Sequence, residues 1–144
     1  MSYAKEFNHL EYNVPDFLLQ NPVWEDVSWH NDVCPRWENY TLMLAVWVDC
    51  AELECREHED WKQYTVCEVL THGGDDYYLA DETLFATEDV NILAAWLSLH
   101  ETYVHLENAA AALNNVPVPD EIMSDELHSL LAMVKERLED LKTL

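Results

Sequence analysis

Four side chains of types that bind zinc fall close together between residues 50 and 67. Cys50, Cys55, His58 and Cys67 are spaced as C-x4-C-x2-H-x8-C, and thiolate and imidazole are ligands that zinc accepts. Structural zinc sites usually bring their ligands in two close pairs, and no matched second pair is present here. Cys67 also lies in the strand-like run YTVCEVLT, where a buried free thiol is ordinary. A small cytoplasmic zinc-binding or regulatory module built on these four residues therefore stays as an alternative, while the main prediction includes no metal and no cofactor.

Catalytic signatures are weak elsewhere in the sequence. His100 and His105 are five residues apart, whereas the H-E-x-x-H motif of metalloproteases needs a spacing of four. No G-x-S-x-G elbow is present, and the only two glycines stand in HGGDD at residues 72–76, where the aspartates would repel a phosphate. The sequence therefore predicts a protein that is not an enzyme, and an unrecognised catalytic site is the weaker alternative.

Carboxylates are the remaining chemical groups in excess. The chain carries 29 acidic and 7 basic residues, a formal net charge of −22, and residues 63–134 hold 13 acids without any Lys or Arg. Such a field repels nucleic acids and anionic membranes and attracts cationic surfaces. Because binding to DNA or RNA depends on neutralising phosphates, the composition argues against direct nucleic-acid binding and favours a basic protein partner.

The densest acids follow an apolar run, in YTLMLAVWVDCAELECREHED at residues 40–60. If the strand in this run continues past Asp49, Glu52 and Glu54 lie about 6.6 Å apart on one face, a spacing that approaches that of phosphates. Carboxylates so placed make charge-assisted hydrogen bonds to Arg and Lys. The predicted partner-binding residues form a first group in this run and a second group further along: Glu52, Glu54, Glu57, Glu59, Asp60; Asp75, Asp76, Asp81, Glu82.

Aromatic residues among the acids are candidates for the anchors that charge alone does not provide. They are Trp24, Trp61, Tyr77 and Tyr78. The alternative for the acidic excess is a solvated surface that serves solubility or a halophilic adaptation. The 72 residues without a single Lys or Arg speak against generic solubility, because cations are normally interspersed on such a surface.

The elements that would position these groups follow from periodicity and turn signals. Alternating apolar residues predict a short strand over 7–14, and Asn21-Pro22 predicts the start of a brief helix that ends near Asn31. Residues 40–49 and 64–71 have the composition of strands. The glycines of residues 72–76 then predict a turn, so that 64–85 forms a hairpin.

The C-terminal part changes to the helical period. Thr87 is a candidate N-cap for a first helix with Glu88 and Asp89 in its first turn, and Asn114 with the following prolines predicts its end. A second helix is expected from about residue 120 or 124 onward, with leucines on one stripe. The predicted fold is α+β, an antiparallel sheet from the middle of the chain packed by a C-terminal helical hairpin.

Length predicts one domain, because 144 residues is a common domain size and suffices to bury a core without disulfides. Its segments are 1–39 (strand, short helix and loop), 40–86 (antiparallel strands) and 87–144 (helical hairpin). The N-terminal residues lack the apolar segment of a signal peptide, and no apolar run approaches the ~20 residues of a membrane span. We therefore expect a cytoplasmic protein with reduced cysteines.

In size and charge the chain resembles the small acidic inhibitors carried by phages and other mobile elements, which include DNA-mimic proteins directed at restriction enzymes and some anti-CRISPR proteins. This resemblance covers the whole chain as composition and includes no motif, so no functional residue is carried over. It implies a partner that is a host nucleic-acid-binding complex with a channel lined by Lys and Arg.

Overall fold

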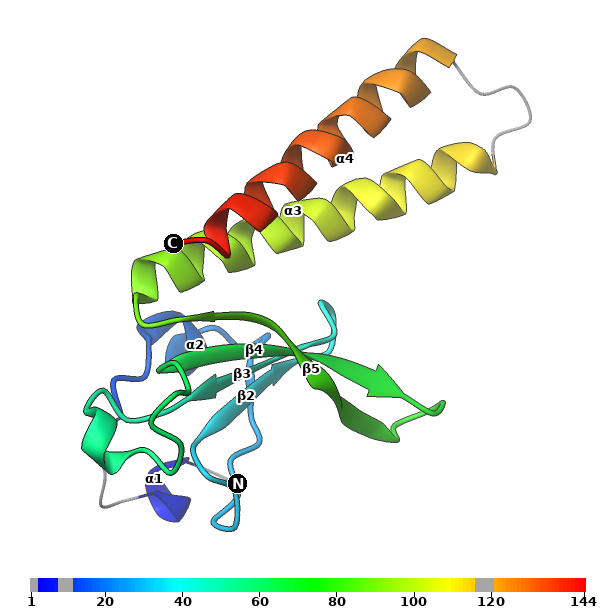
Figure 1. The fold of residues 1–144 in the computed structure, drawn as a ribbon. Coiled ribbons are helices and arrows are strands. Elements are labelled where there is room, and N and C mark those ends of the chain that lie inside the picture. Colours follow the sequence, from blue (N-terminus) through cyan, green and yellow to red (C-terminus); the bar gives the residue numbers. More distant parts are fainter. Residues whose placement is uncertain (1–2, 8–11, 116–120) are drawn as a thin grey trace. The chain divides into compact units, whose positions relative to one another are not determined.

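The computed structural model describes residues 3–7, 12–115 and 121–144 (Figure 1). The chain forms two compact units, Met1–Val90 and Asn91–Leu144, and the prediction of a single domain stays a prediction. The first unit contains the sheet and the second contains most of the long helices. The elements are α1 (Tyr3–Glu6), α2 (Asp16–Gln20), β1 (Glu25–Asp26), β2 (Arg36–Asn39), β3 (Leu44–Val48), the 3-10 turn η1 (Leu53–Cys55), β4 (Tyr64–Thr71), β5 (Tyr77–Thr87), α3 (Val90–Asn114) and α4 (Glu121–Leu141).

Five strands form one antiparallel sheet in which each strand pairs with the next along the chain, in the order β1-β2-β3-β4-β5. This confirms the predicted α+β class and the antiparallel sheet from the middle of the chain. Each strand of such a meander pairs with its neighbour along the chain. The connections differ in length, from residues 40–43 between β2 and β3 to residues 49–63 between β3 and β4.

The β4–β5 hairpin was predicted correctly. Its turn contains Gly73 at φ 118° and Gly74 at φ 63°, conformations that glycine adopts at no steric cost. Pairing of β3 with β4 stops at Glu68, whereas β4 and β5 stay paired out to Thr71 and Tyr77. The end of the hairpin therefore extends beyond the shorter strands as a two-stranded ribbon (Figure 1).

One cross-strand row forms the centre of the sheet's buried face. Trp37, Val46, Val66 and Phe85 are successive partners across β2, β3, β4 and β5, and Val46 and Val66 have no solvent exposure. Residues one position along each strand point to the opposite face because side chains alternate. That second face, which includes Trp47 and Thr65, is half-buried and becomes relevant below.

The prediction for residues 21–31 was wrong. Asn21 and Pro22 do not start a helix, because the Asn21 Oδ1 atom accepts a hydrogen bond from the Val23 N–H (3.2 Å) and its backbone carbonyl accepts one from the Trp24 N–H (3.0 Å). These bonds form a turn. The helix lies earlier, at α2 after Pro15, and Glu25 and Asp26 pair with β2 instead.

Two strand predictions also need correction. Of the strand expected over 7–14, residues 8–11 lie outside the described residues and 12–14 are not in a strand. The strand expected over 40–49 begins only at Leu44, because residues 40–43 turn: the Asn39 Oδ1 atom accepts from the N–H groups of Thr41 and Leu42 at 3.0 Å, and Met43 has φ 53°. The four-residue strand β2 was not predicted.

The two C-terminal helices were predicted, and they run in opposite directions (Figure 1). α3 begins at Val90 rather than just after Thr87, since Thr87 is the last residue of β5 and its Oγ1 atom accepts from the Asp89 N–H at 3.1 Å. The predicted proline linker lies in residues 116–120, outside the described residues. None of the helices in the described ranges combines the length and the apolar character that crossing a bilayer requires.

The cross-strand row predicts a strong asymmetry between the two faces of the sheet. Phe85→Ala empties part of the buried face and should lower the free energy of unfolding by about 3–5 kcal/mol. Thr65→Ala, on the opposite face of the neighbouring strand, is the matched control and should change it by less than about 1 kcal/mol. Urea denaturation measures both, and equal losses in the two variants would contradict the assignment of the faces.

Candidate functional site

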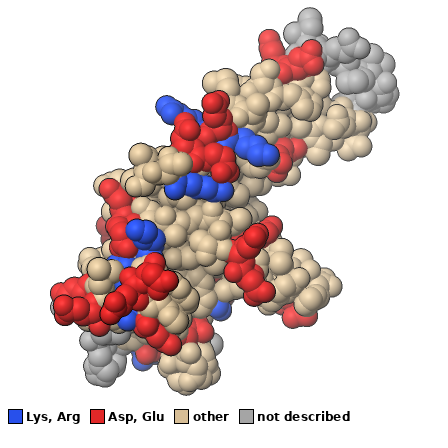
Figure 2. Space-filling model, in the orientation of Figure 1, with Lys and Arg blue, Asp and Glu red and all other residues tan. Residues whose placement is uncertain are grey.

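All nine acids predicted to bind a partner are exposed. Five of them lie in residues 50–63, which we call the acidic loop, and four lie on the β4–β5 hairpin, which we call the hairpin patch. Figure 2 shows acidic side chains gathered over the loop that contains η1 and a second group over the hairpin, with uncharged surface between them. The acidic loop presents Glu52, Glu54, Glu57, Glu59 and Asp60, and the hairpin patch consists of Asp75, Asp76, Asp81 and Glu82.

The strand-like spacing expected for Glu52 and Glu54 is not observed. β3 ends at Val48, and Leu53–Cys55 form the 3-10 turn η1. The acidic residues are therefore not displayed along a strand at phosphate-like intervals. They project from a compact loop whose shape depends on its internal hydrogen bonds.

Arg56 provides most of those bonds from inside the acidic loop. Its side chain is only 1% exposed, and its Nε donates to the Cys50 carbonyl at 2.7 Å. Nη1 donates to the Trp61 carbonyl at 2.7 Å, and Nη2 donates to the Ala51 carbonyl at 3.2 Å. The same two nitrogens form a bidentate pair with Glu88, at 2.9 and 2.8 Å. A guanidinium has five N–H donors, and all five have an acceptor here.

This arrangement fastens both ends of the acidic loop to the sheet. Cys50 and Ala51 begin the loop and Trp61 lies near its end, while Glu88 directly follows β5. The Glu88 carboxylate also accepts from the Gln63 N–H at 3.3 Å. Because every N–H of the planar Arg56 guanidinium is hydrogen-bonded, few other conformations of the loop are compatible with it. The exposed carboxylates are therefore held by an ordered loop.

Two carboxyl groups near Arg56 have pKa values that are shifted in opposite directions, for different reasons. The hydrogen bonds and charge of Arg56 lower the pKa of Glu88 below its usual 4.5. Burial raises the pKa of Asp49 above its usual 3.8, against the opposing effect of the hydrogen bond from the Cys50 N–H. Glu88 is therefore a stabilising anion, and Asp49 is an anion whose burial costs free energy.

Three of the four predicted aromatic anchors are at the surface. Trp61 is 44% exposed and lies against His58, with ring centroids 4.3 Å apart and ring planes tilted by 40°. Tyr77 and Tyr78 are exposed on the hairpin. Trp24 was predicted wrongly, because it is 9% exposed and belongs to the core.

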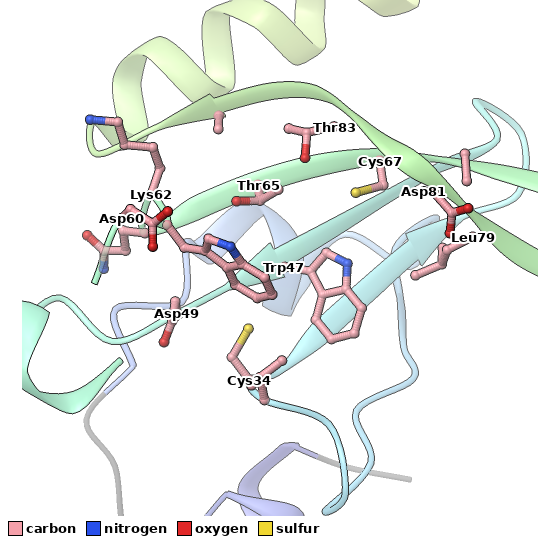
Figure 3. A pocket seen from close by; sticks show the side chains of 15 residues that line it. Cys34, Trp47, Asp49, Asp60, Lys62, Thr65, Cys67, Leu79, Asp81 and Thr83 are labelled. Atoms are coloured by element: carbon pink, nitrogen blue, oxygen red, sulfur yellow. The ribbon is translucent and has the colours of Figure 1, made fainter. Parts of the chain in front are cut away.

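A hollow of about 530 Å³ lies on the half-buried face of the sheet, in the first unit (Figure 3). Asp60 of the acidic loop and Asp81 of the hairpin patch both line it, so the structure brings one member of each predicted group to a single concave site. Trp47 and Trp61 line it as well. Its volume lies within the ~300–1,000 Å³ of ordinary ligand sites, and we call it the tryptophan hollow.

The cysteines and histidine of the predicted zinc alternative are in different environments. Cys50 is buried, Cys55 is exposed and Cys67 is half-buried on β4. Burial raises the pKa of Cys50 and Cys67, which favours the thiol over the metal-binding thiolate. Within the described ranges, no group of three or more His, Cys, Asp or Glu side chains is placed to hold a metal ion. No observation therefore favours the zinc alternative.

The sequence did not predict that Arg56, Glu88 and Trp47 are parts of the site. Arg56 had a signal, since it is the only cation between Asp49 and Asp60 and a lone base among many acids is a candidate for an internal ion pair. Glu88 is 32 residues away from it, and such a pairing is visible only in the fold. Trp47 stood in an apolar strand, where a core position was the ordinary expectation.

The comparisons with known proteins found no relative of this chain. The sequence matches no protein-family model, and no curated protein or solved structure is similar to it. The function is therefore inferred from the residues and their geometry.

Arg56 offers a direct test of how the acidic loop is held. Arg56→Lys keeps the charge but replaces five N–H donors with three that cannot form a planar fork. It should lower the free energy of unfolding by about 3 kcal/mol and increase hydrogen exchange of the amides in residues 50–63. Arg137→Lys is the matched control, because Arg137 is exposed and pairs with Asp140 at 3.3 Å; its effect should stay below about 0.5 kcal/mol. Equal effects of the two substitutions would contradict the role of Arg56.

The lowered pKa of Glu88 predicts a pH dependence of stability. A carboxyl whose folded pKa is below its unfolded value stabilises above the unfolded pKa, and this contribution is lost as pH falls through the folded pKa. Glu88→Gln should therefore be less stable than the wild type at about pH 7, and the difference should shrink below about pH 4. Urea denaturation at both pH values measures it.

Asp49→Asn supplies the comparison of opposite sign. Because the pKa of Asp49 is raised in the folded protein, its ionisation opposes folding above that pKa and is relieved at low pH. The stability of this variant relative to the wild type should therefore rise from about pH 3 to about pH 7. The same direction of change for both variants would show that one of the two pKa shifts is misassigned.

Proposed function

We propose that this protein is a non-enzymatic, cytoplasmic binding protein that docks on the basic nucleic-acid-binding surface of a protein partner. It would act as an inhibitor of the kind found in DNA-mimic and anti-CRISPR proteins of phages and other mobile elements. One observation carries the proposal: nine exposed carboxylates project from a loop and a hairpin, and the cation at the centre of that loop is turned inward.

The charge balance of the first unit supports this function. Residues 1–90 contain 20 acids and 4 bases. Of those bases, Arg56 is buried in the acidic loop and Arg36 pairs with Glu38 at 3.2 Å. Lys62 is exposed near the end of the acidic loop, and the first unit still carries a large excess of outward carboxylate. Such a surface attracts a basic partner over a long range and accelerates association at low salt.

The ordered frame of the loop adds affinity that charge alone would not provide. A flexible acidic segment loses conformational freedom when it binds, and that loss reduces its affinity. Here the bonds of Arg56 fix the loop before the partner arrives. Carboxylates held in place can form charge-assisted hydrogen bonds with the Arg and Lys side chains of a nucleic-acid channel.

The contrast with α4 supports a specialised first unit. Near the C-terminus, Arg137 pairs with Asp140 and Lys142 pairs with Glu139 at 2.9 Å. There, cations and anions are interspersed as on an ordinary soluble surface. The acids of α4 therefore provide a control surface of the same charge type within the same chain.

Charge reversal in the acidic loop tests the proposal. The triple substitution Glu57→Lys, Glu59→Lys and Asp60→Lys should weaken capture of nucleic-acid-binding proteins from a host lysate at low salt by at least about tenfold. Captured protein should elute with salt and should be displaced by double-stranded DNA, because both compete for the same basic surface.

The matched control reverses three exposed acids of α4, Asp125, Glu126 and Glu136, and changes the net charge by the same amount. It should retain most of the binding. If both triple variants bind equally well, or if DNA does not displace the captured protein, the proposal is wrong.

A further inference from the structure

The tryptophan hollow originates in a change of side-chain size across the sheet. Trp47 on β3 is the partner of Thr65 on β4, which is the partner of Ala86 on β5, and Cys67 is the partner of Thr83. These residues line the hollow. A large indole beside four small side chains leaves space on one face of the sheet. The small side chains form the floor of the hollow.

The two ends of the hollow carry negative charge. Figure 3 shows Asp60 near one end and Asp81 near the other, with Trp47 and Thr65 between them. Lys62 is the only Lys or Arg among the residues that line it. Asp49 lines the hollow as well. A phosphate-bearing ligand would meet these carboxylates, whereas a cation with an apolar stem would match the carboxylates and the apolar floor together.

The indoles favour a planar cation. Inside the protein, the Arg36 guanidinium already lies over the Trp47 ring, with its Cζ atom 4.7 Å from the ring centroid. Trp61 adds a second indole at the edge of the hollow and is exposed. Guanidinium groups stack on indole faces and also bond carboxylates with a planar fork, which an ammonium group does not do.

We propose that the tryptophan hollow receives an arginine side chain of the basic partner, with its guanidinium against Trp61 or Trp47 and bonded to Asp60 or Asp81. This inference rests on the proposed function and deepens it. The acidic loop and the hairpin patch would attract the basic surface as a whole, and the hollow would select arginine over lysine within it.

The test compares two synthetic peptides of equal length and charge, one with alternating arginine and glycine and one with alternating lysine and glycine. Binding to the full chain is measured by isothermal titration calorimetry and by tryptophan fluorescence at low salt. The arginine peptide should bind about three- to tenfold more tightly than the lysine peptide.

Three substitutions then locate the preference. Trp61→Ala removes an exposed indole, and Thr83→Trp fills the hollow from an exposed position of β5. Each should lower the arginine-to-lysine ratio. Asp81→Asn should weaken the arginine peptide more than the lysine peptide. Glu57→Gln, which removes the same charge from a residue that does not line the hollow, should weaken both peptides equally and leave the ratio unchanged.

The outcomes separate the two proposals. Equal affinity for both peptides in the wild type, or a ratio unaffected by Trp61→Ala and Thr83→Trp, overturns the arginine hollow and leaves the proposed function standing. If neither peptide binds even at low salt, the arginine hollow fails and the proposed function fails with it.

Discussion

The position of the acidic loop depends on one guanidinium. Arg56 satisfies its five donors with three loop carbonyls and the Glu88 carboxylate, so a segment of mutually repelling acids is closed around a buried positive charge. Glu88 follows β5 directly, and the loop therefore takes its place from the sheet. Without this interaction the five exposed carboxylates of the loop would repel each other into an extended segment, since like charges oppose compaction.

Elements with strong local signals were predictable. β4, its glycine turn and β5 combine β-branched residues with a turn that needs positive φ, and α3 and α4 are long enough for the helical period to dominate. The N-terminal elements are short, and their signals have two meanings: the Asn21 side chain can cap a helix or close a turn, and only the pairing of Glu25 with Glu38 decides between them. β2 has four residues, two of them charged, which is too little to show a period.

The site was predictable as a set of surface acids but not as a shape. Exposure of the nine candidate acids follows from their charge, because unpaired carboxylates are rarely buried. That Asp60 and Asp81 line one hollow depends on the register between β4 and β5 and on the path of the acidic loop, and neither is encoded by local spacing. The place of Trp47 in the hollow could not be predicted either. The face of the sheet to which an apolar residue points depends on the register of its strand.

The arginines of the first unit form contacts within the fold and therefore do not neutralise the exposed carboxylates of its surface. Arg36 is engaged with Glu38 and Trp47, and Arg56 is engaged with the acidic loop, so both arginines of the first unit act within the fold. The hairpin patch lies in a stretch of 72 residues without Lys or Arg. Self-repulsion of this kind lowers stability, and a surface that served solubility alone would gain from interspersed cations. Under the proposed function, a basic partner supplies the missing charges, and its arginine would form in the hollow the kind of contact that Arg36 forms with Trp47 in this chain.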